Sequence, residues 1–515
     1  MKENFDINDN LPIIVGVGQV VKQWNGLELN EAPNPVDIIK EAIEVALCDA
    51  SDVGLKEEID YAAIIRTFPD SLPMPYNPFG KIINLPAAVL QGLKIKPKNV
   101  MYTSAGGEQP QFQVSSISEK LYNGEIEFAI IAGGEVNGAL KRAVKLGAKL
   151  DWASNEDFSI TDNGPKTDFI TEYELKNGLG LPPQTYASME DGLRARLKMS
   201  VADYAEYTSK ILSNLSEVAS KNEYAQFPKH LPSSFLSTPS RSNYRLYNNY
   251  LKWSMAQDAV NQSAAIIITT VRKAKKLSIP QEKWVYLHGY SNIEDTFVTH
   301  RPDISKSDAI SLVINKALKT SKLNPTDIDY KEIYSCFPIV LILAAEVLGV
   351  DPTQECLTVT GGLPFFGGPG NNYSSHGIAA LVESLRKDRG AFGLVLANGG
   401  FMSKESSGIY STKAPDDWSV IDNKDDQRFV DNRPSVNLLN EDCKAEIEGF
   451  CLKYDRDIPQ SGYVIAKNDK GRILAKIKTN NHKMLKFLSG DIDVVGKTAK
   501  FSYEAGYNYI VDLNL

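Results

Sequence analysis

Short apolar runs alternate with amphipathic segments along the first 414 residues of the chain. In DIIKEAIEVAL, residues 37–47, apolar side chains recur every three or four positions and form one face of a helix. FAIIAGGE, residues 128–135, is a short apolar run closed by paired glycines, which is typical of a strand buried on both faces. Strands that alternate with such helices predict an α/β fold with parallel sheets covered by helices.

The same order of elements returns about 270 residues further along the chain. Four segments of the first half have a counterpart in the second: 37–47 with 308–318, 59–69 with 332–338, 103–107 with 360–362, and 128–135 with 392–400. The run at 103–107 and its counterpart are each expected to follow a strand. The repeat predicts two similar βαβαβ halves.

The stretch between the halves, residues 137–262, is polar and rich in Tyr, Ser and Asn. It contains a helical segment at 201–219 and is too long to be a plain loop in a compact domain. We interpret it as an inserted domain that lies over a binding site. The alternative is an excursion that does not contact substrate.

The pattern changes again from residue 415. An acidic linker leads into short alternating segments, and residues 468–471 offer a tight hairpin turn. This predicts a small antiparallel β-barrel or sandwich, similar to an OB fold. The expected domains are a first half, an insert, a second half and this small β-rich domain, at residues 1–136, 137–262, 263–414 and 415–515.

Composition limits the classes of function. The hydrophobic fraction of 43% and charged fraction of 23% are typical of a globular protein. A net charge of -8 and a pI near 5.4 argue against bulk nucleic-acid binding, which needs a basic surface. The C-terminal segments nevertheless carry many lysines with Tyr463 and Phe487 among them, a mixture that suits a single-strand nucleic-acid barrel. We prefer the interpretation of a solvated β surface whose lysines discourage edge pairing.

Five cysteines are scattered along the chain and none has metal-ligand spacing. This pattern predicts neither a disulfide framework nor a metal site, and a reducing cytoplasm is the expected location. The acidic N-terminus lacks the features of a signal peptide. The longest apolar run, 337–350, is too short to cross a bilayer and contains Glu346, so no membrane partner is expected.

Four segments, in order and spacing, resemble the thiolase superfamily: AGGEVNGALKRA (132–143), QDAVNQSAAIIITT (257–270), YSCFPIVLILAAEVLG (334–349) and TGGLPFFGGPGNNYSSHGIAAL (360–381). The third resembles the His-Asp-Cys-Phe motif of the sterol-carrier-protein type. With the extra C-terminal domain, the chain is similar to type-1 thiolase-like proteins, commonly named acetyl-CoA acetyltransferases. The resemblance implies the five-layered thiolase fold and acyl transfer in lipid metabolism. It implies no bound cofactor, with a coenzyme A thioester as the substrate.

Thiolase chemistry needs a nucleophilic thiolate, a base and oxyanion donors. The resemblance places the family's nucleophilic Cys on Ser104, and the two catalytic His residues on Tyr334 and Gly368. Only the Cys of the His-Asp-Cys-Phe motif is kept, as Cys336. A serine hydroxyl without an adjacent base is a poor acyl acceptor, so the catalytic site is altered.

Cys336 is therefore the first candidate for nucleophile or base. It follows a predicted buried strand at a strand-to-helix turn, where a helix N-terminus can lower the pKa of a thiol. The alternative is that Cys336 is a small buried apolar residue.

His376 is the one histidine near these motifs. At the start of a predicted helix it could enter the pocket that Gly368 leaves empty and replace the missing base or oxyanion donor. The alternative is a solvent-facing histidine in the first helical turn. Asn371 and Asn372 either donate to a thioester oxygen or cap the helix.

The resemblance also implies where coenzyme A binds. The segment around Lys252 and the helix from residue 201 lie where thiolases hold the pantetheine and adenine. Lys252, with Arg241 and Arg245, could then meet the phosphates. The alternative is that these are surface cations of a polar insert.

Two further functions remain beside an acyltransferase with an altered site. One is an inactive protein that binds CoA or acyl-CoA, and the other is nucleic-acid binding through the C-terminal domain. Oligomeric state stays open, because thiolases are usually dimers or tetramers but an extra domain could cover the dimer face.

Overall fold

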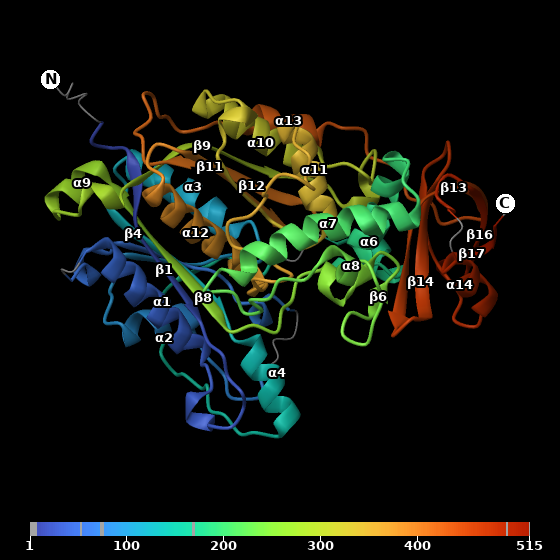
Figure 1. The fold of residues 1–515 in the computed structure, drawn as a ribbon, viewed down its shortest axis with the longest axis horizontal. Helices are drawn as coiled ribbons and strands as arrows, with labels where there is room; N and C mark the ends of the chain where they lie inside the picture. Colours follow the sequence, from blue (N-terminus) through green and yellow to red (C-terminus); the bar gives the residue numbers. More distant parts are fainter. Residues whose placement is uncertain (1–7, 52–53, 73–76, 167–169, 491–492, 514–515) are drawn as a thin grey trace.

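The computed structural model describes residues 8–51, 54–72, 77–166, 170–490 and 493–513 (Figure 1). Ten strands form one sheet in the order β10-β11-β12-β9-β1-β8-β4-β2-β3-β5, and seven more form a second sheet at the C-terminal end. The two halves of the large sheet meet where β1 pairs with β9 at Ile13 and Ile14.

The first half contains β1, β2, β3, β4 and β8 with helices α1, α2 and α3. In it, β2 is parallel to β3 and β4, while β8 is antiparallel to β4 and β1. The bounds are β1 Pro12–Val21, α1 Pro35–Ala50, β2 Tyr61–Ile64, α2 Leu85–Gly92, β3 Asn99–Tyr102, α3 Gln109–Tyr122, β4 Phe128–Glu135 and β8 Gln262–Thr270.

The second half repeats this order of pairing and confirms the duplication. Here β10 is parallel to β11, and β12 is antiparallel to β11 and β9. The bounds are α9 Val271–Lys276, β9 Val285–Glu294, α10 Asp308–Ser321, β10 Tyr330–Ile333, α11 Pro338–Leu348, α12 Tyr373–Lys387, β11 Phe392–Gly399 and β12 Lys404–Ser411.

Two expectations for the sheet were wrong in detail. Each half is mixed, because β8 and β12 return antiparallel beside β4 and β11. Residues 355–360, all described, form no strand. Instead the amide of Ile333 donates to the carbonyl of Leu357 at 2.9 Å. The apolar pattern shows that a segment is buried, but pairing depends on the neighbour that tertiary structure supplies.

The layers follow from which helices lie between the sheet halves. Helices α3 and α12 contact each other and strands of both halves, so they form the central layer (Figure 1). Helix α1 covers β1 and β8 on one outer side, and α10 covers β9 and β12 on the other. The five-layered arrangement is therefore confirmed. Gly18 permits the close approach of α1, since a Cβ there would lie 2.3 Å from the carbonyl oxygen of Ala42.

The segment between the halves extends the sheet of the first half with β5, and its two longest helices pack over the second half. Its longest helix, α7, begins after Ser200, whose side chain accepts a hydrogen bond from the amide of Asp203, and it confirms the helix predicted at 201–219. Helices α6 and α7 both contact α11. The bounds are α4 Asn137–Leu146, β5 Thr161–Asp162, α5 Glu172–Lys176, α6 Pro182–Arg196, α7 Val201–Ser220, α8 Ser233–Leu236, β6 Arg245–Tyr247 and β7 Tyr250–Leu251.

The second sheet confirms a β-rich C-terminal domain. Its pairings run β13–β14–β15–β17–β16 and return to β13, and the β15–β17 contact is a single parallel pair. The predicted turn at 468–471 joins β14 to β15. Its classification as an OB-like barrel, and the four domain boundaries, stay predictions. The bounds are α13 Lys424–Asp431, β13 Cys443–Asp455, β14 Ile458–Lys467, β15 Arg472–Lys476, α14 His482–Leu488, β16 Thr498–Glu504 and β17 Tyr507–Leu513.

Buried charges dock this domain on the insert and the second half. Arg194 of α6 donates to both carboxylate oxygens of Asp493. Arg472, fully buried, donates to Glu448 and to the carbonyls of Thr299 and Arg301. Tyr463 is also buried at this interface, where its hydroxyl contacts α6. A nucleic-acid surface that includes Tyr463 is therefore wrong, because docking covers the ring.

We predict that Gly449→Ala weakens the docking of the C-terminal domain. A Cβ at Gly449 would lie 2.1 Å from the carbonyl oxygen of Ser188 in α6, and neither backbone can yield without disturbing its element. Urea denaturation should show the free energy of unfolding lowered by about 1–3 kcal/mol. Gly180→Ala is the matched control, since the nearest atom to its Cβ is a leucine methyl at 3.7 Å. Equal effects of the two substitutions would contradict this account of the interface.

Candidate functional site

The candidate residues follow the carboxyl ends of parallel strands, where α/β folds place their ligands. Ser104 follows β3, Tyr334 and Cys336 follow β10, and Asn398 lies near the end of β11. Gly107 joins the two halves here. A Cβ on it would lie 2.5 Å from both the Tyr334 hydroxyl and the Asn398 carbonyl oxygen. The fold thus brings both halves together around the turn that carries Ser104.

Cys336 is enclosed by polar and aromatic side chains. The Asn398 amide donates to its sulfur at 3.4 Å and to the Tyr186 hydroxyl at 2.9 Å, and the Tyr186 ring stacks on Phe337 at 4.3 Å. Burial raises the pKa of the Cys336 thiol to about 12, and the nearby Glu405 adds to the rise. The expectation that the strand-to-helix turn lowers this pKa is wrong, because desolvation outweighs the helix end.

Tyr334, at the position of a family histidine, packs against other side chains. Its ring meets Tyr373 edge-on at 5.4 Å, and burial raises the pKa of its phenol well above the ordinary value. A neutral phenol of this kind does not accept a proton at neutral pH.

His376 lies fully buried at the start of α12. Its Nδ1 hydrogen-bonds with Oε1 of Gln19 at 2.9 Å, and its ring meets Phe366 at 5.1 Å. Burial lowers the pKa of the imidazole to about 3, so the ring is neutral and a weak base. The ring therefore does not face solvent. It contacts Gln19 and Phe366 and does not enter the space beside Gly368, so both interpretations from the sequence are wrong.

The insert occupies the space next to Gly368. The three atoms nearest to a Cβ there belong to Gln257, Ala256 and Leu363, at 3.4–3.5 Å. The amide of Ala256 donates to the carbonyl of Cys336 at 3.1 Å, and the amide of Gly368 donates to the carbonyl of Gln257 at 2.8 Å. The segment that leads from Lys252 therefore runs between the two motif loops.

Asn371 and Asn372 hold loops of the first half. Asn371 accepts from the amide of Gly106 at 3.0 Å and donates to the carbonyl of Arg66 at 2.8 Å. Asn372 donates to the carbonyl of Gly133 at 2.6 Å and does not cap α12. Hydrogen bonds within the protein occupy both side-chain amides. Neither donation to a thioester oxygen nor helix capping, the two roles expected from the sequence, is therefore seen.

The cations expected for CoA phosphates contact their own chain. The Lys252 ammonium lies 4.8 Å from the centre of the Trp253 ring. Arg245 donates to the carbonyl of Asn248 at 2.7 Å and lies 5.7 Å from the Tyr454 ring centre. Arg241 is exposed. Their role toward CoA stays a prediction.

Ser104 lines a cavity of about 360 Å³ at the start of α3. The walls come from α3, β9 and β12 and include Glu108, Phe112, Ile293, Lys404 and Glu405. Among the three catalytic candidates, Ser104 is the one that lines this cavity, although its exposed fraction of 8% equals that of Cys336.

Glu108 and Glu405 are the residues that sequence reasoning missed. Glu108 stands four positions after Ser104, and its Oε2 would lie 2.0 Å from a Cβ on Gly106 and 1.7 Å from one on Gly399, so only glycines leave it room. Burial raises its pKa to about 7, opposed by the Gln109 amide and the charge of Lys404 and supported by Glu294. Burial also raises the pKa of Glu405 well above the ordinary range, against the opposing charge of Arg301. The position of Glu108, four residues after Ser104, was the sequence signal that could have identified it.

Comparison with solved structures finds a protein that matches nearly the whole chain. A monomeric SCP2-thiolase-like protein type 1 from Mycobacterium smegmatis is 30% identical, with 98% of this chain and 99% of that chain covered and a TM-score of 0.83. The chain belongs to the SCP2-thiolase-like proteins of type 1.

More distant proteins agree with the thiolase fold. The dimeric peroxisomal thiolase of Saccharomyces cerevisiae matches 79% of this chain at 13% identity and a TM-score of 0.55, which shows the fold alone. Proteins named acetyl-CoA acetyltransferase from Methanocaldococcus jannaschii and Methanothermobacter thermautotrophicus are 32% and 31% identical over 138 and 180 residues. These matches cover 26% and 35% of this chain, and 33% and 43% of the relatives' own length. No protein-family model matches the chain.

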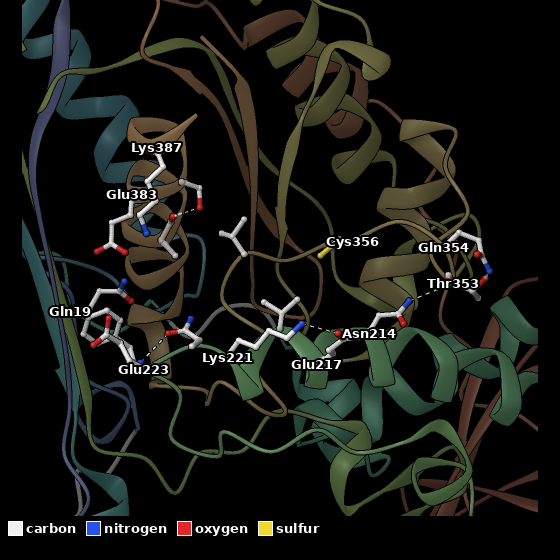
Figure 2. A pocket seen from close by; sticks show the side chains of 16 residues that line it. Gln19, Asn214, Glu217, Lys221, Glu223, Thr353, Gln354, Cys356, Glu383 and Lys387 are labelled. Carbon is white, nitrogen blue, oxygen red and sulfur yellow. Dashed lines mark hydrogen bonds and ion pairs between the residues drawn. The ribbon is translucent and has the colours of Figure 1, made fainter. Parts of the chain in front are cut away.

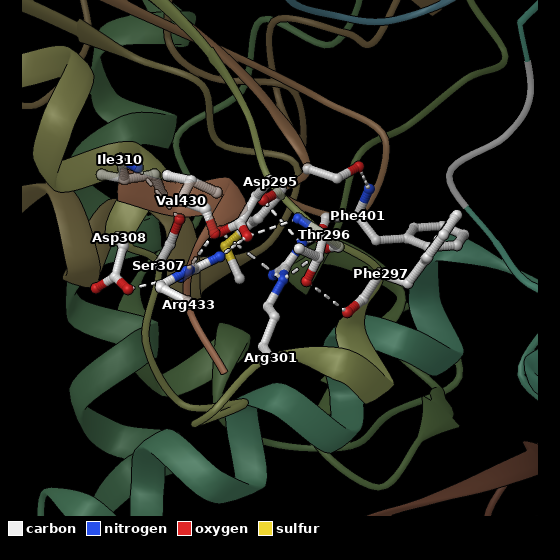
Figure 3. A network of polar contacts seen from close by, with 12 residues as sticks. Asp295, Thr296, Phe297, Arg301, Ser307, Asp308, Ile310, Phe401, Val430 and Arg433 are labelled. Carbon is white, nitrogen blue, oxygen red and sulfur yellow. Dashed lines mark hydrogen bonds and ion pairs between the residues drawn. The ribbon is translucent and has the colours of Figure 1, made fainter. Parts of the chain in front are cut away.

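A buried ion network supports the wall of this SCP2-thiolase-like site. Asp295 lies between Arg301 and Arg433, and Arg433 also binds Asp308 at 2.6 Å (Figure 3). Arg301 donates to the carbonyls of Phe401 and Met402, and the amide of Met402 donates to the Tyr186 hydroxyl at 3.1 Å. The network thus fixes the loop that follows β11 and Asn398, and it ties α13 to the site.

A second cavity of about 680 Å³ lies between α7 and α12 (Figure 2). Its charged residues are Glu217, Lys221, Glu223, Glu383 and Lys387, and Lys221 already pairs with Glu217 at 2.8 Å. Gln19 reaches its floor from β1 and hydrogen-bonds with His376 behind it. Helix α7, which begins at Val201, forms one side of this cavity.

Two absences hold for the described part of the chain. No group of three or more His, Cys, Asp or Glu side chains is placed to hold a metal ion there. Within the same residues, every helix is too short or too polar to cross a membrane.

We predict that Cys336 resists alkylation. A thiol with a pKa near 12 is almost entirely protonated at pH 8, and the thiolate is the reactive form. Peptide mapping after iodoacetamide treatment of the native protein should show Cys48, which is exposed, modified well before Cys336. Modification of Cys336 at the rate of Cys48 would contradict the enclosure described here, and denaturation should equalise the two.

We predict that Glu108→Gln changes how stability depends on pH. A carboxyl with a raised folded pKa stabilises fully below its unfolded pKa of 4.5, and this contribution is lost as pH rises through about 7. The loss corresponds to about 3 kcal/mol. Part of this contribution is already lost at pH 5, so from pH 5 to pH 8 the free energy of unfolding should fall by about 2.5 kcal/mol less in the variant than in wild type.

Urea titrations at both pH values give the comparison. Glu135 and Glu190, whose pKa values burial raises to about 8, are present in both proteins, so the difference isolates Glu108. Parallel curves for the two proteins would show that Glu108 is not held in the protonated form.

Proposed function

We propose that this protein is a thiolase-type acyltransferase that acts on acyl-CoA thioesters and uses Ser104, in place of a cysteine, as the acyl acceptor. The observation that supports this is the Ser104 cavity, which contrasts with the enclosed Cys336 thiol and its pKa of about 12. Membership of the SCP2-thiolase-like proteins supports the thioester class.

Glu108 lines the same cavity as Ser104 and is the proposed base for the serine nucleophile. A carboxyl with a pKa near 7 is ionised in about half of the molecules at neutral pH, the range in which a general base is effective. In the acylation step, the Ser104 hydroxyl proton passes to the Glu108 carboxylate as Oγ bonds to the thioester carbonyl carbon. The carbon–sulfur bond then breaks, and the leaving CoA thiolate takes the proton from Glu108, which gives acyl-serine and free CoA.

Two lysines lie where the Ser104 cavity adjoins a second cavity, beside the carboxylate of Glu294. A neighbouring cavity of about 680 Å³ shares Lys166, Glu294, Lys404 and Gln427 with the Ser104 cavity, so the two adjoin. Lys166 and Lys404 can meet CoA phosphates as point charges. Phe112 and Ile293 offer an apolar wall to the acyl group beside Ser104.

A second candidate is a CoA-binding protein that has lost the reaction. It is favoured by the tight fit of Glu108 against Gly106 and Gly399, which fills space beside Ser104. The two candidates differ in one respect, which is whether a covalent acyl group forms.

We predict that incubation with acetyl-CoA or acetoacetyl-CoA leaves an acyl group on Ser104. Intact-protein mass spectrometry with peptide mapping should find the adduct, and added free CoA should remove it. Ser104→Ala should abolish the adduct, whereas Cys336→Ala should retain it. Glu108→Gln should slow its formation by about 100-fold, the range for loss of a general base.

An adduct on Cys336 would contradict the assignment of Ser104. Absence of any adduct, together with a CoA-dependent rise in melting temperature, would establish the CoA-binding protein. That rise should fall in Lys404→Ala if the phosphates lie at the shared mouth of the two cavities.

A further inference from the structure

Two tyrosine rings lie on the outer face of β17, with Tyr507 exposed and Tyr509 half-buried. Tyr507, Tyr509 and Val511 occupy alternate positions of this strand and therefore share one face. Tyr507 is 37% exposed and Val511 52% exposed. The two ring centres are 6.5 Å apart with the planes inclined by 50°. The tyrosines thus form a pair of accessible aromatic surfaces at the end of a hairpin.

Three lysines from two parts of the chain surround these rings. Lys476 and Lys176 lie 4.6 Å and 5.5 Å from the Tyr507 ring centre, and Lys478 lies 5.0 Å from that of Tyr509. Lys476 ends β15, whereas Lys176 belongs to α5 of the insert. We call these five residues the aromatic–lysine face.

This face differs from the part of the second sheet that docks on the insert. Tyr463 and Leu474 of β14 and β15 are buried in the core that also contains Tyr186 and Met189. The aromatic–lysine face lies beside that interface, at the edge where β15 meets β17 through the pair Lys476 and Tyr509. Docking therefore covers one surface of the sheet and leaves the tyrosine pair accessible.

The strands of this domain carry a small positive charge, although the whole domain, residues 415–515, has 15 Lys or Arg and 17 Asp or Glu, a net of -2. Residues 443–513 contain twelve Lys or Arg and nine Asp or Glu, a net of +3, whereas the chain as a whole carries -8. Two carboxylates lie near the face: Glu504 pairs with Lys478 at 2.7 Å, and Asp512 lies 3.7 Å from Lys500. Lys176 and Lys476 remain as cations over an aromatic ring.

We propose that the aromatic–lysine face binds single-stranded nucleic acid, with unpaired bases stacked on Tyr507 and Tyr509 and phosphates paired with Lys176 and Lys476. An exposed cation–π contact contributes about 0.5–1 kcal/mol. Stacking of a base on an aromatic side chain contributes about 1–3 kcal/mol. A base can therefore displace a lysine from the ring, and the released ammonium group is then placed for the adjoining phosphate.

Single strands fit this face better than duplexes. The bases of a duplex are stacked on each other and offer no free ring surface to Tyr507 or Tyr509. The few cations and the nearby Glu504 and Asp512 limit the electrostatic part of the affinity, so binding should be weak and only modestly salt-dependent.

The test uses the full-length protein and a fluorescein-labelled oligothymidylate of about 20 nucleotides. Fluorescence anisotropy at about 50 mM salt should show saturable binding, and Tyr507→Ala or Tyr509→Ala should raise Kd about tenfold. Tyr507→Phe should keep the affinity because the ring remains. Lys476→Ala should reduce the slope of log K against log salt by about 0.7.

Tyr503→Ala is the matched control. Tyr503 is 40% exposed on β16, but it pairs with Asn508 and so points to the opposite face of the hairpin from Tyr507 and Tyr509. The Tyr503→Ala variant should bind the oligonucleotide with the affinity of the wild-type protein. The same series with oligouridylate reports any preference between DNA and RNA, and equal binding of both still supports the proposal.

Three results would overturn the proposal. One is the absence of binding at low salt by a protein whose melting curve is normal. Another is an equal loss of affinity in Tyr503→Ala and Tyr507→Ala. The third is displacement of the oligonucleotide by duplex DNA or polyglutamate at matched charge, which would assign the face to polyanions in general.

Discussion

The packing of α3 against α12 between the two halves is the constraint on which the site depends. Both helices are buried, and each touches strands of both halves. The turn that enters α3 carries Ser104 and Glu108, and α12 holds this turn because Ser374 donates to the carbonyl of Gly107 at 2.8 Å. Neither half alone would position Ser104.

Burial of acidic groups without strong partners gives the site its chemical character. The same desolvation that raises the pKa of the Cys336 thiol, and so suppresses its thiolate, brings the pKa of Glu108 close to neutrality. Burial therefore has opposite consequences for the two groups: it removes a cysteine from nucleophilic use and makes a carboxyl suitable for proton transfer. This difference is the physical basis for proposing Ser104 with a carboxyl base in place of the cysteine.

The insert and the C-terminal domain reach the site through one helix. Helix α6 places Tyr186 against Asn398 on one side and receives β13 on the other, where Gly449 approaches Ser188. The ion network of Asp295, Arg301 and Arg433 supports the loop after β11 from the side of α13. The extra domain thus supports the site through α6 and the residues that follow α13.

The sequence by itself determined the duplication, the helix at 201–219, the hairpin at 468–471 and the family, because periodicity and motif order are local properties. The environment of each site residue was decided by tertiary structure. Cys336 meets Asn398 62 residues away, and His376 meets Gln19 357 residues away. Burial and hydrogen bonding set a pKa, and both depend on such distant partners, so the chain's pattern identified Ser104, Cys336 and His376 but only the packed fold could distinguish them.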